Sequence, residues 1–276
     1  MKNRSNQKKA GFSKEKQRRY SEHTGGGRAK AADTLYIYGK HVVDLALERY
    51  SSVLKRVWVT LEFSDQKLLA KLRRAGAVVD VLNERKLPGN LSREVNHQGV
   101  VAAVPTSAVV QPYTRFMQTA SITPESCFLI LSEIQDPQNV GAMIRSAAAF
   151  GVQAVLLPKH KQAPLTGTVA KVSAGMVFTV PIVEIGNLNT TIGDLQERGV
   201  LVCGLVAAEE SVSLYTQDLT KPLAFVVGNE ATGLRQQTRQ VCDTLLHIPM
   251  HPRCESLNAS AAVVASLAAR AQQYTK

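Results

Sequence analysis

Residues 127–151 read CFLILSEIQDPQNVGAMIRSAAAFG, a stretch that predicts a buried strand, a turn and a helix. The apolar run from Cys127 to Leu131 is typical of a strand that is covered on both faces. The alanine-rich run at the end of the stretch is typical of a helix. Between them lie Asn139 and Gly141, and Arg145 adds a cation to an otherwise apolar segment. Polar residues at a strand-to-helix turn are candidates for a functional site.

The same alternation of strand and helix continues toward the end of the chain. Continuous apolar runs predict strands at 128–131, 154–157, 180–183, 201–205, 224–227 and 245–248, and helical patterns separate several of them. An alanine-rich helix is expected after Asn258, to about residue 272. This alternation predicts an α/β fold with a parallel sheet covered on both faces.

Residues 34–105 predict a small α/β domain of their own. Strands are expected at 35–38, 57–60, 78–82 and 99–104, and helices at 41–50 and 65–75. Gly76 follows the second helix, as is common at helix C-termini. Residues 106–125 change character, with Pro, Ser, Thr and Gln and no long period, and predict a linker with a short helix around 113–119.

Residues 1–33 carry much of the positive charge of the chain. They hold ten Lys or Arg and three acids, a net charge of +7 out of +11 for the whole sequence. With few apolar residues, this segment is expected to be a disordered tail. Its charge favours a nucleic-acid partner that is bound by counterion release, and a solubilising tail is the alternative.

The composition limits the class of protein. With 45% hydrophobic and 20% charged residues among 276, wholesale disorder is excluded. No apolar run reaches the ~20 residues that a membrane span needs, and the polar N-terminus lacks the apolar part of a secretory signal. The four cysteines are widely spaced and form no CxxC pair, so no metal site is expected. A cytoplasmic protein with reduced thiols is the expectation.

Two further stretches resemble the opening one in their place at a strand end. They are 225–235, FVVGNEATGLR, and 246–260, LHIPMHPRCESLNAS. In open α/β sheets, ligands bind beyond the carboxyl ends of the strands, so the three turns are expected to border one site. Taken singly, Gly228 could be a turn residue, Ser256 or Asn258 a helix cap, and Arg145 a surface cation. Their joint occurrence on successive strand ends favours a shared site.

Together the three stretches resemble the motifs of the SpoU (TrmH-like) family of RNA ribose 2′-O-methyltransferases. The first motif is Asp136-Pro-x-Asn139-x-Gly141-x-x-x-Arg145 and the second is Gly228-x-Glu230-x-x-Gly233-Leu234. The third is Ile248-Pro-Met250 followed by Ser256-Leu-Asn258-x-Ser260, and 172–176 resembles a recurrent segment between the first two. The resemblance identifies 126–276 as a methyltransferase domain. Residues 34–105, with Gly39-x-His41, resemble the small domain, similar to a ribosomal protein, that precedes the catalytic domain in bacterial large-subunit rRNA guanosine enzymes.

The resemblance implies a deep trefoil knot in the SPOUT-type C-terminal domain, which would hold S-adenosylmethionine in a bent form. Gly228, Ile248 and Leu257 match the cofactor-binding positions, with Met250 lining the pocket. The implied catalytic set is Arg145, Asn139, Glu230, Ser256 and Asn258. Asn139 would orient Arg145 or the ribose, Glu230 would fix Arg145 or shape the pocket, and Ser256 and Asn258 would position the ribose. In place of the family's small glycine-containing loop, residues 251–255 read HPRCE.

Arg145 could act either as a base toward the ribose or as a clamp on the target phosphate. A guanidinium with a pKa of ~12.5–13.8 is a poor base near neutral pH. This favours a bidentate clamp on the target phosphate with stabilisation of the developing alkoxide. Deprotonation of the ribose by a strongly perturbed Arg145 is the alternative.

The sequence therefore predicts an S-adenosylmethionine-dependent RNA 2′-O-methyltransferase that acts on rRNA, with tRNA as the alternative substrate. The small domain and the tail would hold RNA, which proteins recognise mostly by shape and backbone. The resemblance implies a homodimer in which Arg145 of one chain completes the site of the other. The competing hypothesis is a non-catalytic RNA-binding protein such as a ribosome assembly factor. No membrane partner is expected.

Overall fold

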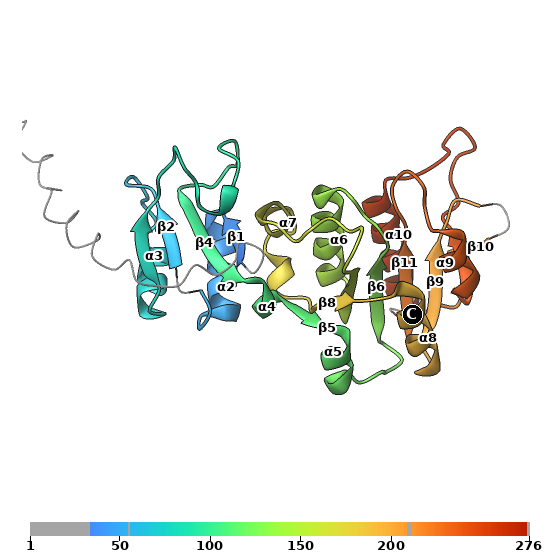
Figure 1. The fold of residues 1–276 in the computed structure, drawn as a ribbon. Coiled ribbons are helices and arrows are strands. Elements are labelled where there is room, and N and C mark those ends of the chain that lie inside the picture. The colour runs from blue at the N-terminus through green and yellow to red at the C-terminus, as the bar shows by residue number, and fades with distance from the viewer. Residues whose placement is uncertain (1–33, 55, 209–210, 275–276) are drawn as a thin grey trace, which may run out of the picture.

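The computed structural model describes residues 34–54, 56–208 and 211–274. The expected disordered tail, residues 1–33, lies outside the described residues. The described chain forms a four-stranded sheet followed by an eight-stranded sheet, which lie side by side in Figure 1. None of the helices in these described ranges is long and apolar enough to cross a membrane.

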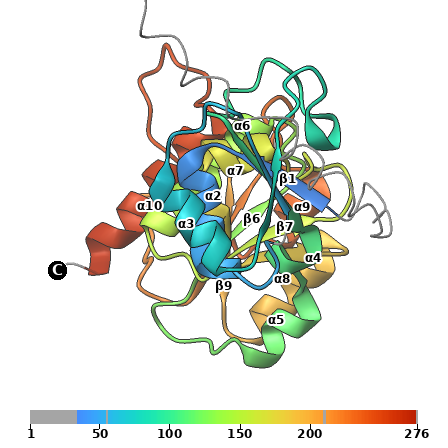
Figure 2. The same cartoon turned by 90° about the vertical axis from the view of Figure 1, so that its left-hand side faces the viewer.

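The smaller sheet has the order β1 (Thr34–Tyr38), β4 (Val100–Pro105), β2 (Arg56–Val59), β3 (Val78–Val81). Strands β2 and β3 are parallel, and β4 is antiparallel to both of its neighbours. Helices α2 (Lys40–Tyr50) and α3 (Gln66–Arg74) belong to this unit, which faces the viewer in Figure 2. Helix α3 begins where the Asp65 carboxylate accepts the amide of Leu68 and buries Leu68, Leu69 and Leu72. The predicted elements of this unit are confirmed to within one residue.

The larger sheet is entirely parallel. Its order is β10 (Val212–Ser213), β12 (Thr244–His247), β9 (Leu201–Leu205), β11 (Leu223–Val227), β6 (Cys127–Leu131), β7 (Ala154–Pro158), β8 (Ile182–Ile185), β5 (Val110–Pro112). In β6, Cys127, Leu129 and Leu131 join one hydrophobic cluster, and Phe128 and Ile130 join another. The strand is apolar throughout because both of its faces are covered, as predicted.

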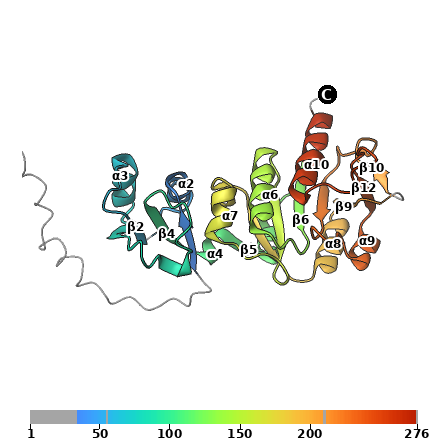
Figure 3. The same ribbon diagram turned by 90° about the horizontal axis from the view of Figure 1, so that it is seen from above.

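Helices cover the two faces of this sheet. Helices α6 (Pro137–Ala149), α7 (Gly167–Val172) and α10 (Ala259–Tyr274) lie on one side, and α8 (Leu188–Glu197) and α9 (Gln236–Val241) lie on the other (Figure 3). Helix α5 (Tyr113–Thr119) packs Phe116 and Met117 into the cluster that α8 also covers. The arrangement places every strand-to-helix turn at an end of the sheet, where a site can form.

Two sequence predictions differ in part from the structure, although the short helix predicted around 113–119 is confirmed as α5. Residues 106–125 are not only a linker, because α4 (Thr106–Val109) leads into β5, an edge strand that pairs with β8. Three residues are too few to show a strand pattern, and proline is tolerated at an edge. The strand predicted at 180–183 begins at Ile182, because η3 (Met176–Phe178) extends the preceding turn and the Val180 amide bonds back to Met176. Strand β10 was not predicted.

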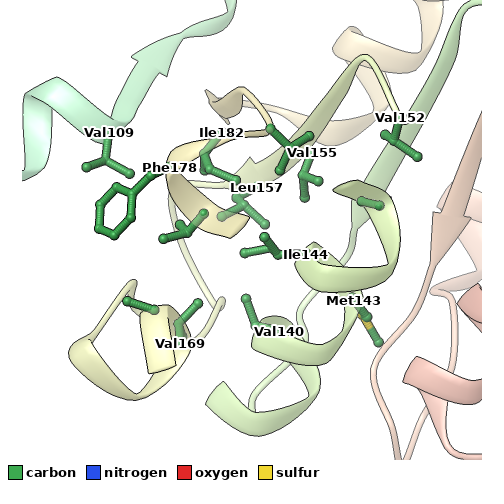
Figure 4. Packing of buried hydrophobic residues seen from close by; sticks show 14 of the residues in the cluster. Val109, Val140, Met143, Ile144, Val152, Val155, Leu157, Val169, Phe178 and Ile182 are labelled. Carbon is green, nitrogen blue, oxygen red and sulfur yellow. The ribbon is translucent and has the colours of Figure 1, made fainter. Parts of the chain in front are cut away.

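The two units share packed side chains. One hydrophobic cluster runs from Ile37 in the small unit to Leu267 in α10. At the junction, the rings of Tyr50 and Phe178 meet edge to face at 5.9 Å, and Phe178 lies beside Val109 (Figure 4). The Tyr38 hydroxyl and the Thr168 hydroxyl lie 3.3 Å apart. The small unit is therefore joined to the large sheet by a continuous core and not by a chain segment alone.

Candidate active site

The parallel sheet brings the three motifs to one edge. The first motif follows β6, the second follows β11, and the third follows β12, with β9 between β11 and β12. Since neighbouring strands are parallel, all of these turns leave the same edge of the sheet. Segments more than a hundred residues apart in the chain thus meet at one place.

A cavity of about 290 Å³ lies between the second and third motifs. Its wall includes these predicted site residues: Gly228, Glu230, Ile248, Met250, Ser256 and Leu257. Asn139, Arg145 and Asn258 are not in its wall, and neither are residues 251–255, so the bulky HPRCE loop does not narrow it. The cavity therefore unites the predicted cofactor residues and leaves most of the predicted catalytic residues outside.

Gly228 lets the second motif fold back on itself. A Cβ at this position would lie 2.3 Å from both the carbonyl carbon of Gly233 and the amide nitrogen of Leu234. The fold-back is held by the Gly233 amide, which donates to the Asn229 carbonyl at 2.8 Å. The Asn229 side chain accepts from the amides of Ala231 and Thr232. At Gly228 the cavity wall is therefore backbone, because no side chain fits there.

The lining suits a flat apolar ring that is recognised by backbone groups. Leu205, Val227, Leu246 and Ile248 contribute apolar surface, and Gly228 and Gly233 contribute backbone. Sites for small organic ligands combine apolar walls with a few placed polar groups. S-adenosylmethionine, with its adenine ring and charged tail, fits these residues.

Part of the wall was not predicted from the sequence. Residues 205–207 at the end of β9 and Arg239 of α9 also line the cavity. The Arg239 Nε donates to the Leu234 carbonyl at 2.9 Å and so braces the second motif. A strand was predicted at 201–205, so its end could have been included, whereas nothing in the sequence pointed to Arg239.

A hydrogen-bonded polar cluster lies beside the cavity and joins all three motifs. Asn139 Nδ2 donates to Glu230 Oε1 at 3.0 Å, and Asn258 Nδ2 donates to Asn139 Oδ1 at 3.1 Å. Asn258 Oδ1 in turn accepts from the amide and the hydroxyl of Ser260 at 2.8 and 2.6 Å. Asn139 is 9% exposed, so its orientation is fixed by these partners. The cluster holds the start of α6 against the second and third motifs.

Glu230 is the charged member of this cluster. Burial raises the pKa of its carboxyl, but hydrogen bonds from Asn139 and from the amides of Gln135 and Asp136 lower that pKa by more than burial raises it. The pKa of Glu230 is therefore below its usual value. Glu230 is therefore ionised at neutral pH, and its negative charge lies in the cavity wall.

Arg145 lies apart from this cluster within one chain. It is exposed on α6, and no hydrogen bond joins it to Asn139 or Glu230. Arg145 follows Asn139 by six residues, which in an α-helix separates the two by about 9 Å along the axis and by about a third of a turn around it. Within a single chain, neither Asn139 nor Glu230 therefore holds Arg145 in place.

Gly141 of the first motif serves helix packing. A Cβ on Gly141 would lie 2.7 Å from the Cβ of Val172 at the end of α7. Glycine at this position allows α6 and α7 to approach closely, which explains a small residue in the first motif and connects it to the 172–176 segment.

Family models match both units. The model of the SpoU rRNA Methylase family matches residues 126–268. The model for RNA 2′-O ribose methyltransferase substrate binding matches residues 36–109.

Individual relatives agree with these matches. The chain is 36% identical over 229 residues to the 23S rRNA (guanosine-2′-O-)-methyltransferase RlmB of Shewanella oneidensis, covering 82% of this chain and 92% of the relative. It is 38% identical to the protein of the same name from Vibrio cholerae, with the same coverage.

Solved structures share the fold. The SpoU methyltransferase AviRb from Streptomyces viridochromogenes, in complex with the cofactor AdoMet, superposes with a TM-score of 0.75 at 22% identity, over 91% of this chain and 95% of that one. An AdoMet-bound rRNA methyltransferase from Sinorhizobium meliloti superposes with a TM-score of 0.73 at 24% identity, over 88% of each chain.

Proposed function

The chain belongs to the SpoU rRNA methylase family, and we infer that it is an S-adenosylmethionine-dependent RNA ribose 2′-O-methyltransferase that acts on rRNA. The observation that carries this is the cavity between the second and third motifs, which adjoins the Asn139–Glu230–Asn258 cluster. The names of the relatives favour a guanosine of 23S rRNA as the target. A bacterial rRNA enzyme of this kind works in the cytoplasm.

S-adenosylmethionine supplies an electrophilic methyl group when bound. Gly228, Ile248 and Leu257 would hold its adenosine part, with Met250 on the apolar wall. The ionised Glu230 places a negative charge beside the site of a cationic ligand, which favours binding of the sulfonium form.

The remaining polar residues would position the target nucleotide. Ser256 in the cavity wall and Asn258 beside it lie where the third motif turns into α10. Their role is to hold the ribose so that its 2′-hydroxyl faces the methyl group, which lowers the entropic part of the barrier. Arg145 would bind the phosphate of that nucleotide through two N–H groups and stabilise the alkoxide that develops.

We propose that the enzyme is a homodimer, since Arg145 does not reach the cavity of its own chain. A row of small side chains on α10 is exposed, namely Ala261, Val264 and Ala268, and Val264 is 42% exposed. Arg145 on the neighbouring α6 and Phe150, which follows that helix directly, are exposed. Burial of this α6–α10 face against a second copy would carry Arg145 toward the partner's cavity.

We further propose that the C-terminal segment forms a trefoil knot and that residues 34–105 bind the RNA substrate. The fold-back of the 228–234 turn and the path of residues 248–258 from β12 to α10 support the knot. The match of the substrate-binding model to residues 36–109 supports the role of the small unit.

Methyl transfer to RNA tests the function. Purified protein should incorporate tritium from labelled S-adenosylmethionine into 23S rRNA transcripts, as a 2′-O-methylated nucleoside. Arg145→Ala should cut the single-turnover rate by at least ~10²-fold, the scale of one preorganised electrostatic group. Arg145→Lys should restore little of the rate, because lysine keeps the charge but lacks the planar fork.

Several outcomes would change the proposal. Methylation of tRNA in place of rRNA would make tRNA the substrate. RNA binding without methyl transfer by the wild type would favour an assembly factor. Near-wild-type rates for Arg145→Lys would exclude the bidentate clamp.

A further inference from the structure

We propose that a groove between the small unit and the edge strand β5 binds the RNA backbone outside the methylation site. The groove has a volume of about 840 Å³, larger than the cofactor cavity. Its wall comes from the start of β1, from the 106–112 segment and from the β7–α7 loop, so both units contribute. Figure 1 shows β5 and α4 at this junction. The inference rests on the proposed RNA substrate and extends it to a second contact.

The groove presents cations that have no partner in the described part of the chain. Arg115 on α5 and Lys159 after β7 are exposed, and neither side chain forms a hydrogen bond or ion pair there. The one carboxylate in the wall, Glu184, forms no ion pair with either of them. The amide Nε2 of Gln162 is buried and has no acceptor among the described residues. Two free cations and an unused donor fit an anion with several oxygens, as a phosphodiester is.

The lining favours phosphate contacts over base stacking. Its side chains are Thr, Ser, Gln, Pro, Ala, Val, Leu, Arg, Lys and Glu, with no aromatic ring on which a base could stack. Contacts of this type fix the position of a nucleic acid without reading its sequence.

The groove is close to the catalytic edge. Lys159 follows β7, which is separated from β11 by β6 alone. With parallel strands ~4.8 Å apart, the groove begins about 10 Å from the strand that carries the second motif. A strand of RNA that contacts the small unit and delivers a ribose to the cavity would pass over the groove.

The groove wall is also tied to the first motif. Gln162 Oε1 accepts from the Ile134 amide at 3.0 Å, and the Ala163 amide donates to the Ile134 carbonyl at 2.8 Å. Gln135 Nε2 donates to the Lys161 carbonyl at 2.6 Å. A phosphate bound at Lys159 and Gln162 would therefore steady the loop that precedes Asn139.

The test uses the full-length protein and 23S rRNA transcribed in vitro. For the double variant Arg115→Gln/Lys159→Gln, the slope of log RNA affinity against log salt should be less steep by roughly 1.4–1.8. This is the change expected for two lost phosphate contacts. Glu184→Gln should bind several-fold more tightly, because it removes the only negative charge of the wall. S-adenosylmethionine affinity should stay at the wild-type value in both variants.

The matched control is Arg198→Gln/Lys221→Gln. It removes the same charge from two exposed cations near the opposite, amino-terminal edge of the sheet, before β9 and β11. Its salt dependence should equal that of the wild type. If the slope of log RNA affinity against log salt falls equally in the control and in the groove variant, the effect is one of net charge and the groove proposal fails.

Two other results would overturn the proposal in different ways. Unchanged RNA affinity and salt slope for the groove double variant, with an active wild type, would show that the groove is not an RNA site. Binding of AMP or GTP that the double variant abolishes, without any change in RNA binding, would assign the groove to a free nucleotide. A wild type that binds RNA but transfers no methyl group would refute the proposed function, while the groove variants would still be tested by binding.

Discussion

At the scale of single residues, Gly228 controls the shape of the cofactor cavity. Its missing side chain lets the backbone of Gly233 and Leu234 lie where a Cβ would otherwise sit, 2.3 Å away. That contact is with backbone atoms, which cannot rotate aside as the end of a flexible side chain can. The sequence pointed to this glycine by its place after a buried strand, and the structure supplies the steric reason.

Gly228→Ala should reduce S-adenosylmethionine affinity at least tenfold and lower the melting temperature, because the 228–234 turn must shift. The matched control is Gly193→Ala in the middle of α8, where a Cβ would meet nothing within 4 Å. That change should stabilise the protein by about 0.8–1.0 kcal/mol through helix propensity. Calorimetric titration and thermal unfolding measure both effects. An unchanged cofactor affinity for Gly228→Ala would remove this turn from the binding site.

Glu230 predicts a pH dependence of stability. Because the pKa of its carboxyl is lowered in the folded chain, its charged form stabilises the fold above its unfolded pKa, near 4.5, and this contribution is lost as pH falls through the lower folded value. The difference in unfolding free energy between wild type and Glu230→Gln should be constant near neutral pH and shrink below pH 4.5. Urea unfolding at several pH values measures it. A difference that widens on acidification would mean that the pKa is raised instead.

At the scale of elements, prediction from sequence succeeded where a segment's pattern reflects its own surroundings. The run 127–131 is apolar throughout because both faces of β6 are covered, and the leucines of α3 repeat at helical spacing because one face is buried. It failed for β5, which is defined by its partner β8 and has only three residues. The same limit applies to the site. The turns of the three motifs could be found from strand ends, but the bonds from Asn139 to Glu230 and Asn258 depend on how α6 packs.

Helix α10 is held at its end by a buried arginine that no sequence pattern singled out. Arg270 is 7% exposed, and its Nη2 donates to the carbonyls of Glu125 and Ser126 at 2.9 and 3.2 Å. Its guanidinium also lies 4.6 Å from the centre of the Tyr274 ring. The Tyr274 hydroxyl donates to the Thr220 carbonyl at 2.8 Å. The C-terminal helix is thereby fixed to the segment that leads into β6.

Arg270→Met should cost about 1.5–3 kcal/mol of stability, the contribution of hydrogen bonds to a charged group, because it removes the bonds from the guanidinium to the carbonyls of Glu125 and Ser126. Arg198→Met is the control, since Arg198 forms an exposed ion pair with Asp194 and should cost at most about 1 kcal/mol. Chemical denaturation of both variants measures the difference. Equal losses would show that the buried position of Arg270 adds nothing.

At the scale of the whole molecule, the proposed homodimer would bring Arg145 of one chain to the cavity of the other. The cavity belongs to one chain, and Arg145 is exposed and does not reach it. A dimer through the α6–α10 face predicts a particle of twice the 30.0 kDa chain mass in sedimentation. Ala268→Glu should yield monomers, because it places a charge in that face while keeping a good helix former. Ala70→Glu, on the exposed side of α3, should remain dimeric.

Mixing two impaired variants tests whether Arg145 acts on the partner's site. Arg145→Ala keeps an intact cavity, and Gly228→Ala keeps an intact Arg145. If each site combines the cavity of one chain with Arg145 of the other, a mixed dimer has one complete site, in which both contributions are wild type. Random reassortment makes about half of the dimers mixed, so roughly a quarter of the wild-type methylation rate should return on mixing. If Arg145 served its own chain, no complete site could form and the mixture would stay as slow as the single variants.

Leu257→Glu, a second change in the cavity wall, should complement Arg145→Ala in the same way and guards against a folding defect in Gly228→Ala. Failure of both mixtures, with exchange between chains verified by differently tagged proteins, would leave Arg145 acting in its own chain.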